Sequence, residues 1–360
     1  MASIFKGRTA GKLLTVIGTL AALLFVAAGC NKAPETAKQE VEKKVEKAAP
    51  KEVTVYSARI EELIKPVFDA FTEETGIKVR FTTAKEEELF ERMKTEGANT
   101  PADMLITVDA GNLWLAAEAD LLQPISSEVL EKNIPGELRD PDNQWFGLSM
   151  RARPIMYSKE RVKPEQLSTY EALADPSWNG RLGLRSSGKV YTQSLIASMI
   201  SSLGASKAEE VVKGWMSNTP VIFDSDTKMI EAIEAGQIDV AVANTYYLGR
   251  IIDKGKPDFP VAVFWPNQAE RGAHVNVSGA GISKYAPNRE AAVELLEWLS
   301  GPKAQKIFAD VNHEYPVNPE VEPHAIIAGW GEFKRDTLNV AELGRSQAEA
   351  VKMADRAGYR

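Results

Sequence analysis

The sequence predicts an α/β protein of two lobes, each with a mostly parallel sheet flanked by helices. Short apolar strands alternate with helical stretches over 53–107, which is the order that gives a parallel sheet. A second α/β unit follows at about 164–264. A strand at 278–282 and a helix at 289–299 then return to the first unit. We therefore expect lobes that are discontinuous in sequence and are joined by two crossover strands.

The first lobe is predicted element by element from its hydrophobic periodicity. After a strand at 53–57, apolar residues recur at helical spacing along one stripe, formed by Ile60, Ile64, Val67, Phe68 and Phe71. The sequence Glu-Thr-Gly at 74–76 ends this helix. The remaining elements are strands at 77–81 and 103–107 and a helix at 86–96.

The second lobe begins after a crossing segment, 145–157, which is predicted as one long strand. The elements expected in it are helices near 192–203 and 228–235 and a strand at 238–243. The predicted boundaries are 51–148 with 276–345 for lobe 1 and 149–275 for lobe 2, followed by a helical tail at 346–360 that is rich in Ala and Glu.

The first 29 residues have the pattern of an export signal. Lys6, Arg8 and Lys12 precede an apolar core that is too short for a comfortable membrane span. The core closes on Ala-Ala-Gly-Cys at 27–30, which resembles the lipoprotein signal box. We expect Cys30 to be lipidated, with an ordinary secretory signal and an incidental cysteine as the alternative.

Cys30 is the only cysteine, so disulfides and thiolate metal sites are excluded from the rest of the chain. Residues 30–50 contain no aromatic residue and are expected to form a flexible tether. Lipid and tether together would hold the folded part at a membrane, in the periplasm or at the cell surface, without inserting it.

The charge is acidic, with a formal net value of −7 that becomes −10 when the three cations of the signal are removed. No Lys/Arg cluster is present, which argues against a nucleic-acid partner. An acidic surface suits a soluble carrier, which we expect to be a monomer.

Three tyrosines suggest a metal site. Tyr246 and Tyr247 directly follow the apolar strand, and Tyr191 lies in a Ser-Gly-x-x-Tyr segment upstream. Phenolate is an anionic oxygen donor that suits a hard trivalent cation, so this pattern favours Fe³⁺. The alternative to a metal site is that Tyr246 and Tyr247 are structural, with one ring packed in the core and the other at the surface. His274, His313 and His324 have no metal-ligand spacing and are interpreted as ordinary loop or surface residues.

These features resemble the bacterial ferric-ion-binding proteins of ABC transporters, which are two-lobed "Venus flytrap" carriers of the periplasmic-binding-protein fold. The resemblance covers nearly all of 52–345. The segments that carry it are 55–59, 101–103, 151–153, 178–181, 187–188, 236–241, 244–247 and 314–319.

The resemblance implies that Tyr191, Tyr246 and Tyr247 are iron ligands and that an ABC permease is the partner. Family members often add a His or a Glu from the first lobe, but the corresponding positions here are Ile60-Glu61 and Val108. The iron ligand set is therefore expected to be completed by a bound anion such as carbonate, or by Glu61. The alternative for Glu61 is a solvated charge at the helix N-terminus.

A bound anion requires cations beside it. Arg59 lies at the start of the first helix, where the helix dipole also favours an anion, and Arg151 and Arg153 lie on the crossover segment. A guanidinium can hold carbonate through two parallel hydrogen bonds. The alternative is that all three arginines form salt bridges.

Two other functions are alternatives to a ferric-ion carrier. A carrier of a small organic or anionic solute on the same fold would use the paired tyrosines to stack on its ligand. An enzyme is disfavoured, because the sequence has no nucleophile elbow, zinc-protease motif or phosphate loop.

Overall fold

The computed structural model describes residues 51–360. The predicted signal peptide, Cys30 and the tether to residue 50 lie outside the described residues. In the described part, no helix is long and apolar enough to cross a membrane.

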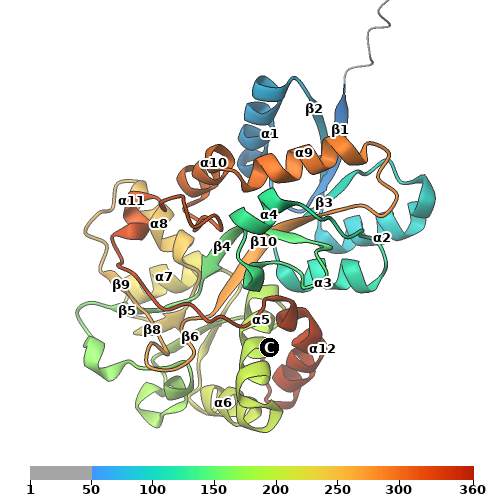
Figure 1. The fold of residues 1–360 in the computed structure, drawn as a ribbon. Helices are drawn as coiled ribbons and strands as arrows, with labels where there is room; N and C mark the ends of the chain where they lie inside the picture. Colours follow the sequence, from blue (N-terminus) through green and yellow to red (C-terminus); the bar gives the residue numbers. More distant parts are fainter. Residues whose placement is uncertain (1–50) are drawn as a thin grey trace, which may run out of the picture. The chain divides into compact units, whose positions relative to one another are not determined.

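The first sheet has five strands in the order β2-β1-β3-β10-β4 (Figure 1). The pairings of β1 with β2 and β3 are parallel, whereas those of β10 with β3 and β4 are antiparallel. Its strands are β1 (Glu52–Ser57), β2 (Lys78–Thr83), β3 (Met104–Thr107), β4 (Phe146–Ala152) and β10 (Val275–Ile282).

The second sheet also has five strands, in the order β7-β6-β8-β5-β9. Here β6 pairs in parallel with β7 and β8, and β5 pairs antiparallel with β8 and β9. Its strands are β5 (Ile155–Ser158), β6 (Leu182–Arg185), β7 (Val221–Phe223), β8 (Val240–Val242) and β9 (Val261–Phe264).

Both sheets are mixed rather than mostly parallel, because the strands at the crossovers run against their neighbours. The predicted long strand over 145–157 is also divided. Arg153 and Pro154 separate β4, which belongs to the first sheet, from β5, which belongs to the second. A proline cannot donate a ladder hydrogen bond, so a change of sheet at this point is reasonable.

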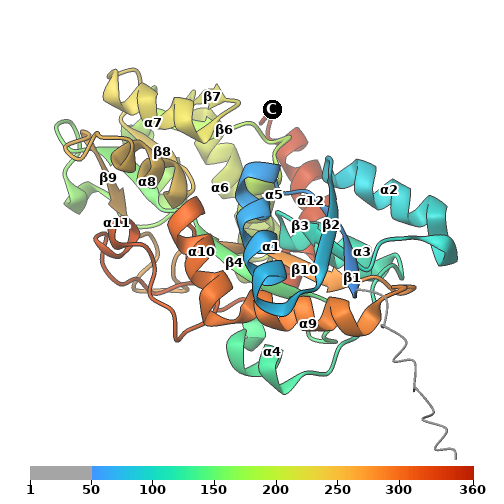
Figure 2. The same ribbon diagram turned by 90° about the horizontal axis from the view of Figure 1, so that it is seen from above.

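The first helix illustrates how sequence determines the local structure. Ile64, Val67, Phe68 and Phe71 of α1 (Glu61–Thr75) are buried, and the helix ends at Gly76 in the left-handed conformation (φ 75°), where glycine has no Cβ penalty. Ile60, which the predicted stripe included, precedes the helix and is 58% exposed. Helix α1 packs on α10, as Figure 2 shows.

The other α-helices cover the two sheets. Their bounds are α2 (Glu86–Glu96), α3 (Ala110–Glu118), α4 (Glu128–Asn133), α5 (Val190–Leu203), α6 (Ala205–Ser217), α7 (Asp226–Glu234), α8 (Thr245–Asp253), α9 (Arg289–Ser300), α10 (Pro302–Asn312), α11 (Ala325–Ala328) and α12 (Ala341–Arg356).

Helix α12 belongs to both cores. Ala341 and Leu343 pack in the cluster built on the first sheet, whereas Ala350 and Met353 pack in a cluster of the second. The helix contacts α3 and α5 (Figure 1). The C-terminal segment is therefore a packed connection between the two halves.

Candidate functional site

Two neighbouring parallel strands place the three tyrosines together. Strands β6 and β8 are paired, and each leads into a helix at its carboxyl end, which is where open α/β sheets bind their ligands. Tyr191 is the second residue of α5. Tyr246 and Tyr247 are the second and third residues of α8.

The phenol groups converge as the sequence predicted. The Tyr246 Oη donates a long hydrogen bond of 3.4 Å to the Tyr191 Oη. The rings of Tyr246 and Tyr247 lie with their centroids 4.2 Å apart. Tyr246 is only 5% exposed, whereas Tyr191 and Tyr247 are half-buried. Three phenol oxygens from two helices can therefore approach one small ion.

Burial keeps Tyr246 and Tyr247 protonated in the absence of a cation. Burial, with repulsion from the neighbouring phenolates, raises the pKa of Tyr246 well above its ordinary value. The same causes, burial first, raise the pKa of Tyr247 to about 12. The positive ends of α5 and α8 act in the opposite direction, but a helix dipole contributes only about 0.3–1 kcal/mol at an exposed terminus. A highly charged cation is needed to displace these protons.

The tyrosines form one wall of a cavity of about 260 Å³. The opposite wall comes from the first sheet and its loops. Its polar residues are Arg59, Arg151 and Glu314, with Ser278 between them, and Ile60, Leu63 and Val108 add apolar surface. Arg250, on α8, also lines the cavity and stacks over the Tyr246 ring at 4.9 Å. The site thus combines phenols with guanidinium groups.

Arg59 is held by a buried ion pair. Its Nη2 donates to Glu314 Oε2 at 2.5 Å, with side chains only 3% and 6% exposed. Ser149 Oγ accepts from Arg59 Nη1 and donates to the same carboxylate. Burial alone would raise the pKa of Glu314, but Arg59 and Arg151 hold this pKa below its usual value. The carboxylate is therefore charged at neutral pH. Sequence reasoning missed Glu314, whose only signal was its place in segment 314–319.

Arg151 lies directly beside the tyrosines. Its Nη1 donates to Ser278 Oγ at 2.8 Å, its Nη2 donates to the Val108 carbonyl, and its Cζ lies 5.2 Å from the Tyr191 ring centroid. Within residues 51–360, the Nε atoms of Arg59, Arg151, Arg153 and Arg185 are all buried and have no hydrogen-bond partner. Of these four arginines, only Arg59 and Arg151 line the tyrosine cavity.

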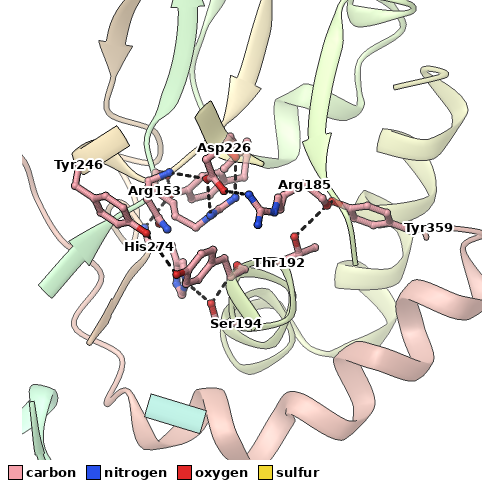
Figure 3. A network of polar contacts seen from close by, with 12 residues as sticks. Arg153, Arg185, Thr192, Ser194, Asp226, Tyr246, His274 and Tyr359 are labelled. Carbon is pink, nitrogen blue, oxygen red and sulfur yellow. Dashed lines mark hydrogen bonds and ion pairs between the residues drawn. The ribbon is translucent and has the colours of Figure 1, made fainter. Parts of the chain in front are cut away.

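Arg153 has a different role in the structure and does not line the cavity. It donates to Asp226 Oδ1 at 3.2 Å, and Arg185 donates to Asp226 Oδ2 at 2.7 Å (Figure 3). The same carboxylate accepts the backbone N–H of Asn244, the residue that precedes α8. This buried network fixes the start of the helix that carries Tyr246 and Tyr247. No motif or spacing in the sequence marked Asp226.

Glu61 does not line the tyrosine cavity. It is exposed in the first turn of α1 and lines a second hollow, which shares Arg59 and Ile60 with the tyrosine cavity. The alternative interpretation of a solvated charge at a helix terminus therefore fits its position.

The sequence predicts that all three histidines are ordinary loop or surface residues, and His274 and His313 do lie outside helices and strands, but both are buried. His274 is buried, and burial together with the neighbouring arginines lowers its pKa to about 3. His313 is buried as well, and its ring lies 4.5 Å from that of His324. Sequence spacing misses such pairs, because the fold brings the two positions together.

Comparisons with known proteins show what the chain is similar to. A family model for bacterial extracellular solute-binding proteins matches residues 57–306. Iron uptake protein A1 of Synechocystis sp. is 47% identical over 315 residues, which are 86% of this chain and 88% of that protein.

Two solved structures are also similar. One is a Trichodesmium protein, IdiA or FutA, in complex with iron and citrate ligands; it is 46% identical, covers 86% of this chain and all of its own, and has a TM-score of 0.82. The other is an apo ferric ion-binding protein A from Pasteurella haemolytica, with 40% identity, coverage of 86% and 98%, and a TM-score of 0.79. These likenesses confirm the predicted α/β periplasmic-binding-protein fold.

Proposed function

Because this chain belongs to the family of bacterial extracellular solute-binding proteins, we propose that it captures ferric iron in the tyrosine-lined cavity and delivers it to an ABC permease. The family consists of solute-binding proteins rather than enzymes. Relatives of this chain are described as iron uptake and ferric iron-binding proteins, and this supports iron as the cargo.

The observation that carries the proposal is the convergence of three phenols on a cavity with two buried guanidinium groups. Tyr191, Tyr246 and Tyr247 would bind Fe³⁺ as phenolates, because hard anionic oxygen donors hold this ion best. Three phenolates neutralise its charge of three. The ligand set would then be completed by an anion.

Arg59 and Arg151 are the residues that we assign to this anion. Both side chains line the cavity that the three tyrosines share. Carbonate or a carboxylate such as citrate offers oxygen acceptors that suit guanidinium groups. We leave Arg153 out of the anion site because it does not line this cavity and its guanidinium is bound to Asp226 and the Val242 carbonyl. We also leave out Glu61, which is exposed beside a different hollow.

The two halves divide the work. The helices that follow strands of the second sheet supply the tyrosines. The first sheet and its connections supply Arg59, Arg151 and Glu314, so iron and anion would bridge the lobes. Only a closed arrangement makes both sets of contacts, which gives closure an energetic cause. Uptake of radiolabelled iron by cells that lack this protein should be lost and should return with the wild-type gene.

We further propose a lipid anchor at Cys30, a location in the periplasm or at the cell surface, and a monomeric state. The lipoprotein box at 27–30 supports the anchor. A Cys30→Ala variant should move from the detergent phase to the aqueous phase in phase partitioning; an unchanged distribution would show that Cys30 carries no lipid.

The test of the iron site is equilibrium dialysis of the purified protein against ferric citrate, followed by metal analysis. The wild type should retain one iron per chain, and the Tyr246→Phe/Tyr247→Phe double variant should retain none. Tyr285→Phe is the matched control, because that tyrosine is exposed and distant from the cavity lining. Equal retention by the double variant would refute the site and favour an organic-solute carrier.

A further inference from the structure

Asp253, His313 and His324 lie together outside the tyrosine cavity. The potential ligand atoms of these three residues all lie within 4.8 Å of one another. His313 Nε2 is 3.6 Å from Asp253 Oδ2. The three residues come from three elements: the last residue of α8, the residue that follows α10, and the residue that precedes α11.

His313 has two features that packing does not explain. It ends α10 in the left-handed conformation, with φ 56°, a position that usually carries glycine because other residues adopt it at a cost of about 1–2 kcal/mol. It is also only 4% exposed, yet neither ring nitrogen has a hydrogen-bond partner among the described residues. A strained backbone and an unpaired buried imidazole at one residue are typical of a functional position.

Helix α8 is shaped to admit this ring. A Cβ at Gly249 would lie 3.2 Å from the Cβ and 3.4 Å from the Cδ2 of His313. The absence of a side chain at Gly249 therefore lets the imidazole lie directly against α8, one turn before Asp253.

We propose that Asp253, His313 and His324 form a second metal site, which takes a borderline divalent ion such as Zn²⁺. Two imidazoles and one carboxylate are the ligands that such ions prefer, with water in the remaining position. Ligands of a tetrahedral Zn²⁺ lie about 3.3 Å apart, given bonds of about 2.0–2.1 Å. The site must therefore contract slightly. Asp253 can supply this movement because its side chain is 55% exposed.

Binding has one local cost. His324 Nδ1 accepts a long hydrogen bond of 3.3 Å from the Ile326 N–H, which caps the four-residue helix α11. If the metal took the other nitrogen, the ring would adopt the opposite tautomer and this bond would be lost. One long hydrogen bond would then be exchanged for a metal–ligand bond.

The site differs from the iron cavity in chemistry and in position. Its ligands are nitrogen and carboxylate rather than phenolate, and none of the three residues lines the tyrosine cavity. The site nevertheless connects to the iron cavity through the chain. Asp253 is the last residue of α8, the helix that begins with Tyr246 and Tyr247 in its first turn. His313 directly precedes Glu314, the ion-pair partner of Arg59. A bound ion would therefore fix α8 to the end of α10.

The test is calorimetric titration of Zn²⁺ into the purified full chain carrying Tyr246→Phe/Tyr247→Phe, so that the iron cavity keeps only one of its three phenols, that of Tyr191. We expect one equivalent to bind. Adding Asp253→Asn or His324→Gln should weaken binding at least 10-fold, since even groups that only orient a metal ligand contribute about 10- to 100-fold. Asp258→Asn, an exposed aspartate five residues after Asp253, should change nothing.

Three results would overturn the proposal. They are the absence of Zn²⁺ binding, binding that Asp253→Asn and His324→Gln leave unchanged, and equal weakening by Asp258→Asn. Circular dichroism of each variant without metal shows whether the fold is kept. Since Asp253 is exposed, its replacement by Asn should not disturb the fold.

Discussion

The phenol oxygens of Tyr191 and Tyr246 lie 3.4 Å apart, although 55 positions separate the two residues in the sequence. Both residues stand in the first turn of a helix, α5 and α8, and the strands that lead into these helices are paired in parallel. The site is therefore a direct consequence of the sheet topology. Any variant that displaces the start of α8 should damage the iron site even if every phenol is retained.

The buried pair between Arg59 and Glu314 should be important for stability. Arg59→Ala leaves a charged carboxylate buried without its partner, which should lower the free energy of unfolding by about 3–5 kcal/mol. Urea denaturation of the iron-free protein measures this. The Arg59→Ala/Glu314→Gln double variant removes both charges and should recover part of the loss. If the double variant were less stable than Arg59→Ala alone, the explanation by an unpaired charge would be wrong.

Arg59→Lys separates the anion role from the ion pair. Lysine keeps the positive charge for Glu314 but lacks the planar guanidinium that binds an anion through paired hydrogen bonds. We expect weaker iron binding, and a larger loss in carbonate-containing than in carbonate-free buffer. Competition with a chelator in the two buffers measures the difference, and an equal loss in both would argue against the anion site.

Glu61→Gln should leave iron affinity within about 2-fold of wild type, because an exposed charge contributes little and Glu61 does not line the tyrosine cavity. The same chelator competition tests this. A collapse of affinity would make Glu61 an iron ligand and would require the start of α1 to move on binding.

Glu86 should make stability depend on pH. Burial, followed by repulsion from Asp109, raises its pKa to about 7, above the ordinary value near 4.3. The folded state then binds more protons than the unfolded state between about pH 4.5 and 7, so this group's contribution to stability decreases as pH rises through that window. The total change is roughly 3 kcal/mol.

Glu86→Gln should remove this dependence. The free energy of unfolding can be measured with urea at several pH values. As pH rises from 5 to 8, the wild type should lose stability relative to the variant. Glu87→Gln, an exposed change in the same helical turn, is the control. A difference that stays constant with pH would mean that Glu86 titrates normally in the folded protein.

Much of the fold could be predicted from local patterns. The stripe formed by Ile64, Val67, Phe68 and Phe71 and the Gly76 cap determine α1 within the chain itself. The division of the crossing segment at Pro154 and the mixed sheets could not be predicted in the same way. They depend on which strands meet in space, and periodicity carries no information on that point.

The candidate site shows the same limit. The tandem pair Tyr246-Tyr247 is visible as a motif, and the paired strands bring Tyr191 to it as expected. Glu314 and Asp226 could not be identified from the sequence, because each forms its ion pair with a residue far away in the sequence. These partners are Arg59 and Arg153, respectively. A single sequence shows which side chains can carry a chemistry, but not which charges the fold pairs.

The central claim is that phenolates hold ferric iron, and the most direct measurement is the visible absorbance of the metal-free protein during titration with ferric citrate. We predict a broad phenolate-to-iron charge-transfer band that saturates at one equivalent and is lost in Tyr246→Phe/Tyr247→Phe. A flat spectrum in the wild type, or the same band in the double variant, would contradict the account.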